Sequence, residues 1–278
     1  MTSGWLQDKV VLITGGSRGI GEACALECAR AGAHVALAGK TVDPHPRLEG
    51  TLGQVADGVR ALGREALVLP TDVRYEEQVQ RMVDSTVSHF GRVDVLINNA
   101  GAIFWSQVGD WPVSKYDLVN GVNVRASFLC SRAVIPHMRE RGGHILMMSP
   151  PINPKGCVGK APYFISKIGM TILAQAIDAE EPKIHACALW PVTAIKTAAT
   201  VNFGLGEEKE WRKPEIISHT TRMLLDRDPS EMQFRAWLDE EVLAANGVTD
   251  LAQYRCVPDY EPAPMSIALM DPDWTRGD

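Results

Sequence analysis

Short apolar runs alternate along the chain with longer stretches in which apolar residues recur at helical spacing. Six apolar runs predict buried β-strands: KVVLIT (9–14), HVALAG (34–39), EALVLP (65–70), VDVLINN (93–99), GHILMMS (143–149) and KIHACALW (183–190). Mostly apolar strands separated by helices are typical of a parallel sheet covered by helices on both faces. The pattern therefore predicts an α/β fold, a doubly wound parallel sheet in three αβα layers. Such sheets bind ligands at the carboxyl ends of their strands.

Composition places the chain among ordinary globular proteins, with 45% hydrophobic and 22% charged residues. Its formal net charge of −6, without a basic run, argues against a nucleic-acid partner bound by charge. The N-terminus lacks the apolar core of a signal peptide, and no apolar run reaches the roughly 18 residues of a membrane span. Six cysteines without a CxxC pair, and histidines without metal-ligand spacing, favour free thiols and no metal site. We therefore expect a soluble, cytoplasmic protein.

A glycine-rich turn, TGGSRGIG (14–21), directly follows the first predicted strand and opens the first predicted helix. Gly15, Gly19 and Gly21 permit a tight turn and a close approach of the backbone to a ligand. The start of the helix then offers free backbone N–H groups to a pyrophosphate. A glycine-rich turn alone is compatible with no ligand at all. Its position after the N-terminal strand of an alternating strand–helix chain favours nucleotide binding and a Rossmann-like sheet.

The spacing of this turn, TGxxxGxG, and four further motifs in order resemble the short-chain dehydrogenase/reductase family. The further motifs are TDV (71–73), NNAG (98–101), GVNV with Asn123, and YFISK with Tyr163 and Lys167 as YxxxK. The resemblance covers residues 8–200 and implies an NAD(P)-dependent oxidoreductase acting on a CH–OH or C=O group. It implies that Asn123, Tyr163 and Lys167 are catalytic and that an aspartate, Asp72, contacts adenine. The residues expected to bind the cofactor are Gly15, Ser17, Arg18, Gly19, Ile20, Gly21, Lys40, Asp72, Val73, Asn99, Ala100, Gly101, Tyr163, Lys167, Pro191 and Thr193.

No linker and no internal repeat divides the chain, so we expect one domain over residues 1–278. Residues 8–200 would form its nucleotide-binding and catalytic core, and residues 201–278 its substrate side. The substrate side is expected to contain an amphipathic helix pair, a last strand and a Pro-rich surface tail (206–226, 234–239 and 256–274).

Tyr163 and Lys167 stand four residues apart on a predicted helix and therefore share one face. A nearby ammonium favours the phenolate and lowers the pKa of tyrosine from its usual value near ~10. The tyrosine can then exchange a proton with an alcohol or carbonyl oxygen near neutral pH. Hydride would pass between the substrate carbon and the nicotinamide, which carries the redox chemistry.

The end of the second predicted strand indicates which nicotinamide cofactor is preferred. Enzymes that use NAD typically place an acidic residue there to bind the ribose 2′-hydroxyl. Here the strand ends ALAGK, with no acid and with Lys40 just beyond it, while Arg18 lies inside the glycine turn. Two cations near the ribose favour a 2′-phosphate, so NADP(H) is expected rather than NAD.

Two positions depart from the family's usual pattern. The family serine stands thirteen residues before the tyrosine, which here is Pro150, and Ser149 lies one residue earlier. Neighbouring side chains of a strand face opposite sides, so either the strand end twists to bring Ser149 to the substrate or the serine role is vacant. We expect the twist, with weak activity on simple carbonyl substrates in either case. PVTAIKT replaces the usual PGxxxT, so either Thr193 or Thr197 would hold the nicotinamide carboxamide.

The partners and the substrate are less closely defined. Phe104, Trp105, Trp190 and Phe203 suggest an apolar pocket for a small molecule, although aromatic residues in strands are more often part of the core. Apolar residues within 126–138 and 170–177 are compatible with a homo-oligomer, a dimer or tetramer, and equally with buried helices. An alternative to the enzyme is a catalytically weak NADP-binding sensor or scaffold protein with the same fold.

Unusual stretches such as HILMMSPPINP and WRKPEIISHTTRMLL look like one subgroup of the family with animal and bacterial members. The animal members carry an additional C-terminal sterol-carrier domain, for which these 278 residues leave no room. The final TRGD is not a peroxisomal SKL signal.

Overall fold

The central feature of the computed structural model, which describes residues 4–44, 49–151 and 157–265, is a parallel β-sheet. Its seven strands have the order β3-β2-β1-β4-β5-β6-β9, and all neighbours pair in parallel. Their bounds are β1 Val10–Thr14, β2 His34–Gly39, β3 Ala66–Pro70, β4 Val95–Asn98, β5 Gly143–Met148, β6 Ile184–Trp190 and β9 Ala236–Leu238. Each of the six predicted strands is present, and β9 lies where the last strand was expected. The predicted doubly wound α/β fold is therefore confirmed.

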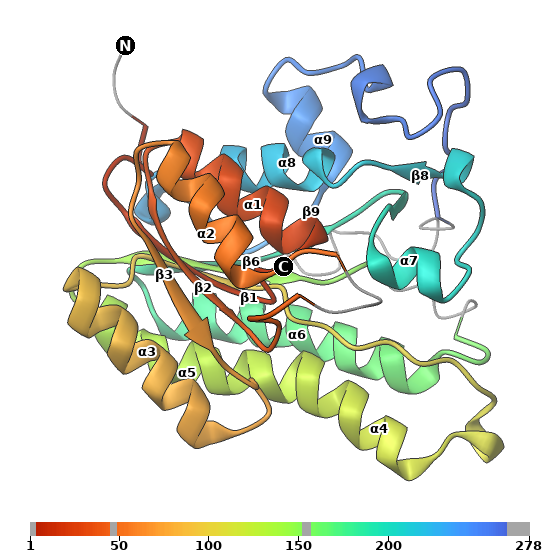
Figure 1. The fold of residues 1–278 in the computed structure, drawn as a ribbon, viewed down its shortest axis with the longest axis horizontal. Helices are drawn as coiled ribbons and strands as arrows, with labels where there is room; N and C mark the ends of the chain where they lie inside the picture. The colour runs from red at the N-terminus through yellow and green to blue at the C-terminus, as the bar shows by residue number, and fades with distance from the viewer. Residues whose placement is uncertain (1–3, 45–48, 152–156, 266–278) are drawn as a thin grey trace.

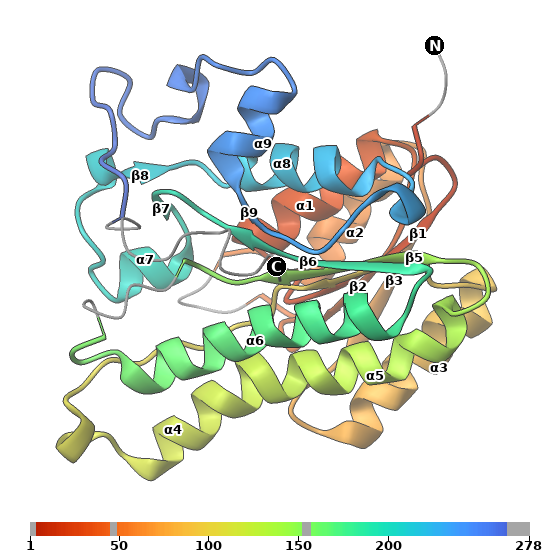
Figure 2. The same ribbon diagram turned by 180° about the vertical axis from the view of Figure 1, so that it is seen from behind.

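Helices cover both faces of the sheet, as the two opposite views in Figures 1 and 2 show. One face carries α1 (Gly19–Arg30), α2 (Leu52–Ala61), α8 (Glu215–Leu225) and α9 (Asp239–Ala245). The other carries α3 (Glu76–Phe90), α4 (Val113–Asn120), α5 (Ala126–Met138) and α6 (Ala161–Glu180). A short helix, α7 (Ala198–Asn202), and the two-residue strands β7 (Ala194–Ile195) and β8 (Trp211–Arg212) follow β6.

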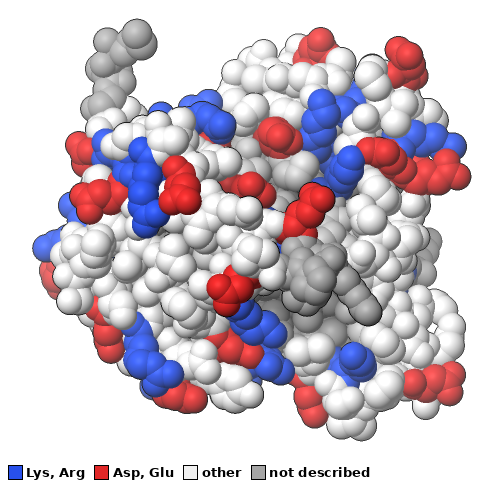
Figure 3. Space-filling model, viewed as in Figure 1, with Lys and Arg blue, Asp and Glu red and all other residues white. Residues whose placement is uncertain are grey.

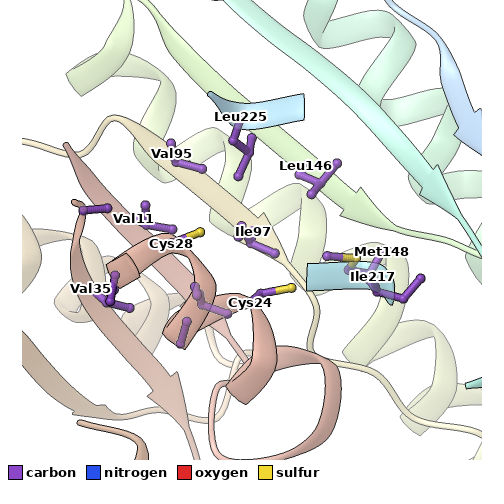
Figure 4. Packing of buried hydrophobic residues seen from close by; sticks show 14 of the residues in the cluster. Val11, Cys24, Cys28, Val35, Val95, Ile97, Leu146, Met148, Ile217 and Leu225 are labelled. Carbon is purple, nitrogen blue, oxygen red and sulfur yellow. The ribbon is translucent and has the colours of Figure 1, made fainter. Parts of the chain in front are cut away.

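The strands are buried on both faces because side chains alternate across the sheet. Val11 and Ile13 of β1 join one core cluster with α1 and α8, whereas Leu12 belongs to the cluster on the other face. Figure 4 shows the first cluster, in which the thiols of Cys24 and Cys28 lie among aliphatic side chains. All six cysteines are free, and burial raises the pKa of Cys24 to about 12, so this thiol serves as an apolar group.

The segment at 206–226 differs from its expected form. Instead of a helix pair, it forms a 3-10 turn at Glu208–Glu210, the short strand β8 and the single helix α8. Pro214 directly precedes α8, and proline is tolerated at the start of a helix but not in its interior. The residues before it therefore take an extended form and pair with β7.

Two surface properties bear on partners. On the face shown in Figure 3, Lys and Arg side chains are interspersed with Asp and Glu and form no separate basic patch. Within residues 4–44, 49–151 and 157–265, no helix combines the length and the apolar character needed to cross a membrane.

Candidate active site

The glycine-rich turn joins β1 to α1 as the sequence predicts. Gly15 and Gly19 have positive φ angles of 69° and 56°, which residues with a Cβ rarely adopt. A Cβ on Gly21 would stand 2.2 Å from the carbonyl oxygen of Gly15, so the first turn of α1 packs directly on the loop. The helix N-terminus, with Ser17 and Ile20 beside it, is thereby held at the carboxyl end of β1. This arrangement fits a pyrophosphate.

The adenosine side of the site is dominated by an ion-paired carboxylate. Arg74 donates two hydrogen bonds to the Asp72 carboxylate, from Nη2 at 2.6 Å and from Nε at 2.9 Å. The Arg74 hydrogen bonds hold the pKa of Asp72 below its usual value. Lys40 Nζ lies 4.0 Å from the same carboxylate, and the neighbouring Val73 is buried. Sequence reasoning missed Arg74, although its position next to the TDV motif could have indicated it.

Arg18 fixes the loop that follows β2. Its guanidinium donates to the carbonyl oxygens of Glu49 and Gly50, at 2.8 and 3.0 Å. The loop after Lys40 therefore returns to the glycine turn, and both predicted cations lie on the same side of the nucleotide site.

The NNAG motif at the end of β4 is tied to the glycine turn by reciprocal hydrogen bonds. The Asn99 amide donates to the carbonyl oxygens of Thr14 and Gly15, each at 3.0 Å. The Thr14 hydroxyl in turn accepts from the backbone N–H groups of Asn99 and Ala100, each at 3.1 Å. Thr14 was not among the predicted site residues, and it joins β1 and β4 where they face the nucleotide site.

Asn123 lies in a π-helical turn, Gly121–Arg125, between α4 and α5. Its amide accepts from Ala102 N at 2.8 Å and donates to Ala102 O and to Ser166 Oγ, at 3.1 and 2.9 Å. The side chain is fully buried and connects the loop after Gly101 to α6. Single π-helical turns are frequent at functional sites, where they re-aim one side chain.

Tyr163 and Lys167 lie on one face of α6 beside the end of β5. Lys167 Nζ donates to Met148 O at 2.8 Å and stands 5.9 Å from the centre of the Tyr163 ring. Burial raises the pKa of Tyr163 to about 12 and lowers the pKa of Lys167 to about 8. Without cofactor the tyrosine is therefore a proton donor at neutral pH, and the lysine remains mostly charged.

The Ser149 hydroxyl points beneath α6 rather than toward Tyr163. It donates to Lys167 O at 2.8 Å and accepts from the Thr171 hydroxyl at 3.1 Å, and the side chain is 1% exposed. Pro150, the next residue, lines the cavity in the family serine position. Ser149 also lines the cavity, but its hydroxyl is used within the protein, so both alternatives, the twisted strand end and the vacant serine role, stay predictions.

The segment after β6 separates the two candidate threonines. The Thr193 hydroxyl is buried in the cavity wall after Pro191 and has no hydrogen-bond partner among the described residues. The Thr197 hydroxyl instead caps α7 and accepts from Thr200 N at 3.3 Å. Val192 N donates to the buried Asp239 at 2.9 Å, which fixes the segment. An unpaired buried hydroxyl in the cavity wall fits a nicotinamide carboxamide, so these residues are compatible with the cofactor.

Ile20, Asn99, Tyr163, Lys167 and Thr193 line one cavity of about 670 Å³ at the carboxyl ends of the strands. Its walls are mostly apolar and include Trp105, Phe164, Leu189 and Met265. Of the four aromatic residues suggested for the pocket, Trp105 lines it, but the others do not: Trp190 is fully buried in the core, Phe203 is 46% exposed, and Phe104 packs against Trp111. The pocket interpretation is therefore confirmed for Trp105 alone, and the alternative of a core position is confirmed for Trp190.

Comparisons with known proteins agree with this geometry. The chain is 38% identical over 263 residues to hydroxysteroid dehydrogenase-like protein 2 of Xenopus tropicalis, covering 93% of this chain and 63% of the relative. It thus spans less than two thirds of the length of that relative. A putative dehydrogenase from Xanthomonas campestris superposes with a TM-score of 0.89 at 37% identity, covering 94% of this chain and 98% of that one.

A more distant solved structure is an alcohol dehydrogenase from Thermococcus sibiricus complexed with 5-hydroxy-NADP. It has a TM-score of 0.74 at 26% identity and covers 84% of this chain and 96% of that one. Residues 9–204 match the family described as short chain dehydrogenase. With its glycine turn, its NNAG motif and its tyrosine–lysine pair around one cavity, the chain belongs to the short-chain dehydrogenase/reductase family of oxidoreductases.

Proposed function

We propose that the protein is an NADP(H)-dependent oxidoreductase that transfers hydride between the nicotinamide and an alcohol or carbonyl substrate. The observation that carries this proposal is the convergence of Tyr163, Lys167 and the unpaired Thr193 hydroxyl on one mostly apolar cavity beside the glycine turn. The bound cofactor supplies the hydride chemistry, and the chain supplies binding, orientation and proton transfer.

Tyr163 is the proposed general acid and base. In the water-poor cavity its pKa is raised to about 12, so at neutral pH it holds the proton that a carbonyl oxygen needs during reduction. Alcohol oxidation requires the phenolate, and positive charge on Lys167 and on the bound cofactor favours that form. The structure therefore favours carbonyl reduction near neutral pH and alcohol oxidation at higher pH.

The test is turnover of a panel of alcohols, aldehydes and ketones with NADP(H), followed by Tyr163→Phe. Loss of a general acid–base is expected to lower kcat by about 10²- to 10⁴-fold while cofactor affinity is retained. Tyr116→Phe is the matched control, because Tyr116 is an exposed tyrosine on α4. A Tyr163→Phe variant with wild-type kcat would contradict the proposed role.

The preference for NADP(H) is proposed from charge. Arg18, Lys40 and Arg74 bring three cations to the adenosine side, and β2 ends without an acid at the ribose position. Lys40→Asp is expected to shift the ratio of kcat/KM for NADPH over NADH toward NADH by at least about tenfold. Lys183→Asp, at the far end of α6, is the control. An unchanged ratio in Lys40→Asp would contradict the proposal that Lys40 sets the preference for NADP(H).

A second candidate function is a catalytically weak NADP-binding sensor or scaffold. The observation that favours it is the Ser149 hydroxyl, whose two hydrogen bonds lie within the protein and not in the cavity. A sensor would bind NADP(H) with micromolar affinity but turn over no member of the substrate panel, and Tyr163→Phe would then change nothing.

We also propose that the protein is a homo-oligomer. Phe128 on α5 and Ile165 and Ile172 on α6 are 48%, 55% and 51% exposed, whereas neighbouring positions of the same helices are buried. A second copy would cover these side chains. Ile172→Glu is expected to give a monomer in light scattering after gel filtration, and an unchanged mass would contradict this interface.

A further inference from the structure

The cavity carries two cations and no carboxylate. Lys160 and Lys167 are among its lining residues, and no Asp or Glu of the described chain lines it. Lys167 is engaged by Met148 O. Lys160 precedes α6 as its N-terminal cap, three residues before Tyr163, and it pairs with no carboxylate within residues 4–44, 49–151 and 157–265. Its ammonium is therefore available to a ligand.

Aromatic contact and backbone pairing hold this ammonium at the cavity. Lys160 Nζ lies 4.5 Å from the centre of the Trp105 ring, a favourable cation–π geometry. Ser106 N donates to Gly159 O at 3.0 Å and so joins the loop that carries Trp105 to the turn that carries Lys160. The two side chains are therefore fixed relative to each other by their own backbone segments.

Trp105 offers a second donor. Its indole Nε1 is buried and finds no acceptor among the described residues. A buried N–H without an acceptor is unfavourable, and an acceptor on a bound ligand would remove that penalty. Lys160 and Trp105 thus both line the same cavity, and the ring that holds the ammonium also carries the unpaired N–H.

We infer that the cavity selects substrates that carry a carboxylate, and that Lys160 and Trp105 form the site for this group. This rests on the proposed function for the identity of the reacting group. Lys160 stands directly before α6, three residues from Tyr163, and both side chains line the same cavity, so the carboxylate would bind in the cavity that holds the proton donor. The substrate class is therefore a hydroxy acid or oxo acid whose apolar remainder fills the rest of the cavity.

Binding of a matched pair of probes tests the charge without requiring turnover. Decanoate and decan-1-ol share an apolar chain and differ in charge, and calorimetric titration measures their affinities. We expect wild type to bind decanoate at least about tenfold more tightly than decan-1-ol, as for a charge-assisted hydrogen bond. Lys160→Met abolishes this preference, and Trp105→Phe, which keeps an aromatic ring but removes the N–H, reduces it.

Lys115→Met is the matched control, because Lys115 lies over the Phe104 ring but does not line the cavity. It should retain the wild-type preference for decanoate. Equal affinities in wild type, or a preference that survives Lys160→Met in a variant with wild-type Tm, would overturn the inference.

Kinetics separates this inference from the proposed function. The substrates are 4-oxopentanoate and its methyl ester, with NADPH consumption as the readout. Lys160→Met should lower the ratio of kcat/KM for the acid over the ester by at least about tenfold. If uncharged ketones are turned over but Lys160→Met leaves the ratio of kcat/KM for the acid over the ester unaltered, the carboxylate site is overturned and the proposed function is not. Lys160-dependent decanoate binding without turnover of any panel member supports the carboxylate site and overturns the proposed function.

Discussion

Ionisable side chains are buried in both halves of the sheet, but the two halves differ in how many of these side chains have an ion-pair partner. In the half formed by β1–β4, Asp94 is 1% exposed, yet it accepts from Val10 N at 2.9 Å and pairs with Arg92. In the half formed by β5, β6 and β9, the buried His185 contacts Asp178, whereas His144, Lys167 and Asp239 are buried and make no ion pair with any described residue. A buried carboxylate that is held by an arginine and a backbone N–H is fixed in place, so Asp94 ties the start of β1 to the start of β4.

Unpaired burial has the opposite consequence for the substrate half. It lowers the pKa of His144 to about 3 and that of Lys167 to about 8, and it raises the pKa of Asp239 to about 7. In every case desolvation is the largest cause, and it favours the neutral form. Side chains whose pKa values are shifted in this way are typical of sites that exchange protons. We therefore expect the first half mainly to hold the fold in place and the second half to carry the groups that exchange protons.

The largest expected effect comes from the tight packing of the nucleotide half. Gly21→Ala would place a Cβ 2.2 Å from Gly15 O, although alanine normally stabilises a helix relative to glycine. Overpacking by about 1–3 kcal/mol should lower Tm by roughly 3–10 °C, and displacement of the loop should weaken NADPH binding by at least about tenfold. Gly109→Ala is the control, because no atom lies within 4 Å of its added Cβ. Wild-type NADPH affinity in Gly21→Ala would refute the close packing.

The next effect is a pH dependence that originates in the substrate half. Burial lowers the pKa of His144 in the folded protein to about 3, from the value of 6.5 for a free histidine. Below about pH 6.5 the His144 imidazole takes up a proton in the unfolded chain but stays neutral in the folded chain. The free energy of unfolding therefore falls as the pH falls toward 3. The slope from this group is up to about 1.4 kcal/mol per pH unit.

Urea unfolding between pH 7 and pH 4 measures this slope. His144→Gln should flatten it relative to wild type, whereas His137→Gln, at an exposed position of α5, should not. Equal slopes for all three proteins would show that His144 is not held neutral. His144 would then no longer count among the buried, unpaired groups of the second half.

A smaller effect is expected where Asp239 holds the segment after β6. Its Oδ1 accepts from Val192 N and Glu240 N, each at 2.9 Å, directly before Thr193. Asp239→Ala leaves the Val192 N–H without an acceptor, which is unfavourable by about 1–3 kcal/mol and should weaken NADPH binding roughly tenfold. Asp239→Asn keeps an acceptor and should recover most of this loss, and Asp259→Ala on the surface is the control. Equal NADPH affinity in all three variants would show that Asp239 does not position Thr193.

The same division explains how far the sequence could predict the site. The glycine turn and the Tyr163–Lys167 face were predictable because each is a local pattern whose geometry is set by neighbouring residues. The contact between Asp239 and Val192 joins residues 47 apart, and nothing near either residue indicates it. The grip of Arg74 on Asp72 is local, but many arginines follow an aspartate without binding it. The fold class followed from strand and helix alternation, whereas the orientation of Ser149 depended on a partner in α6.

The smallest expected effect concerns Ser149. A hydroxyl that stabilises a substrate oxygen contributes about 10²- to 10³-fold to the rate. The Ser149 hydroxyl instead donates its proton to Lys167 O and accepts from Thr171, so it supports α6 and has no proton left to donate to a substrate oxygen. Ser149→Ala should therefore change kcat by less than about threefold while it lowers Tm by a few degrees, since one buried hydrogen bond contributes about 1 kcal/mol.

Pro150 makes this prediction decisive, because it stands in the family serine position and lines the cavity. Pro150→Ser would add a hydroxyl thirteen residues before Tyr163, and it should raise kcat on simple ketones if the serine role is vacant. Pro151 also lines the cavity and is the matched control: Pro151→Ser should give no gain if the rate depends on a hydroxyl at the family serine position. A fall of kcat by more than tenfold in Ser149→Ala, with no gain in Pro150→Ser, would return the catalytic role to Ser149. The substrate half would then use its hydroxyl for chemistry and not for the support of α6.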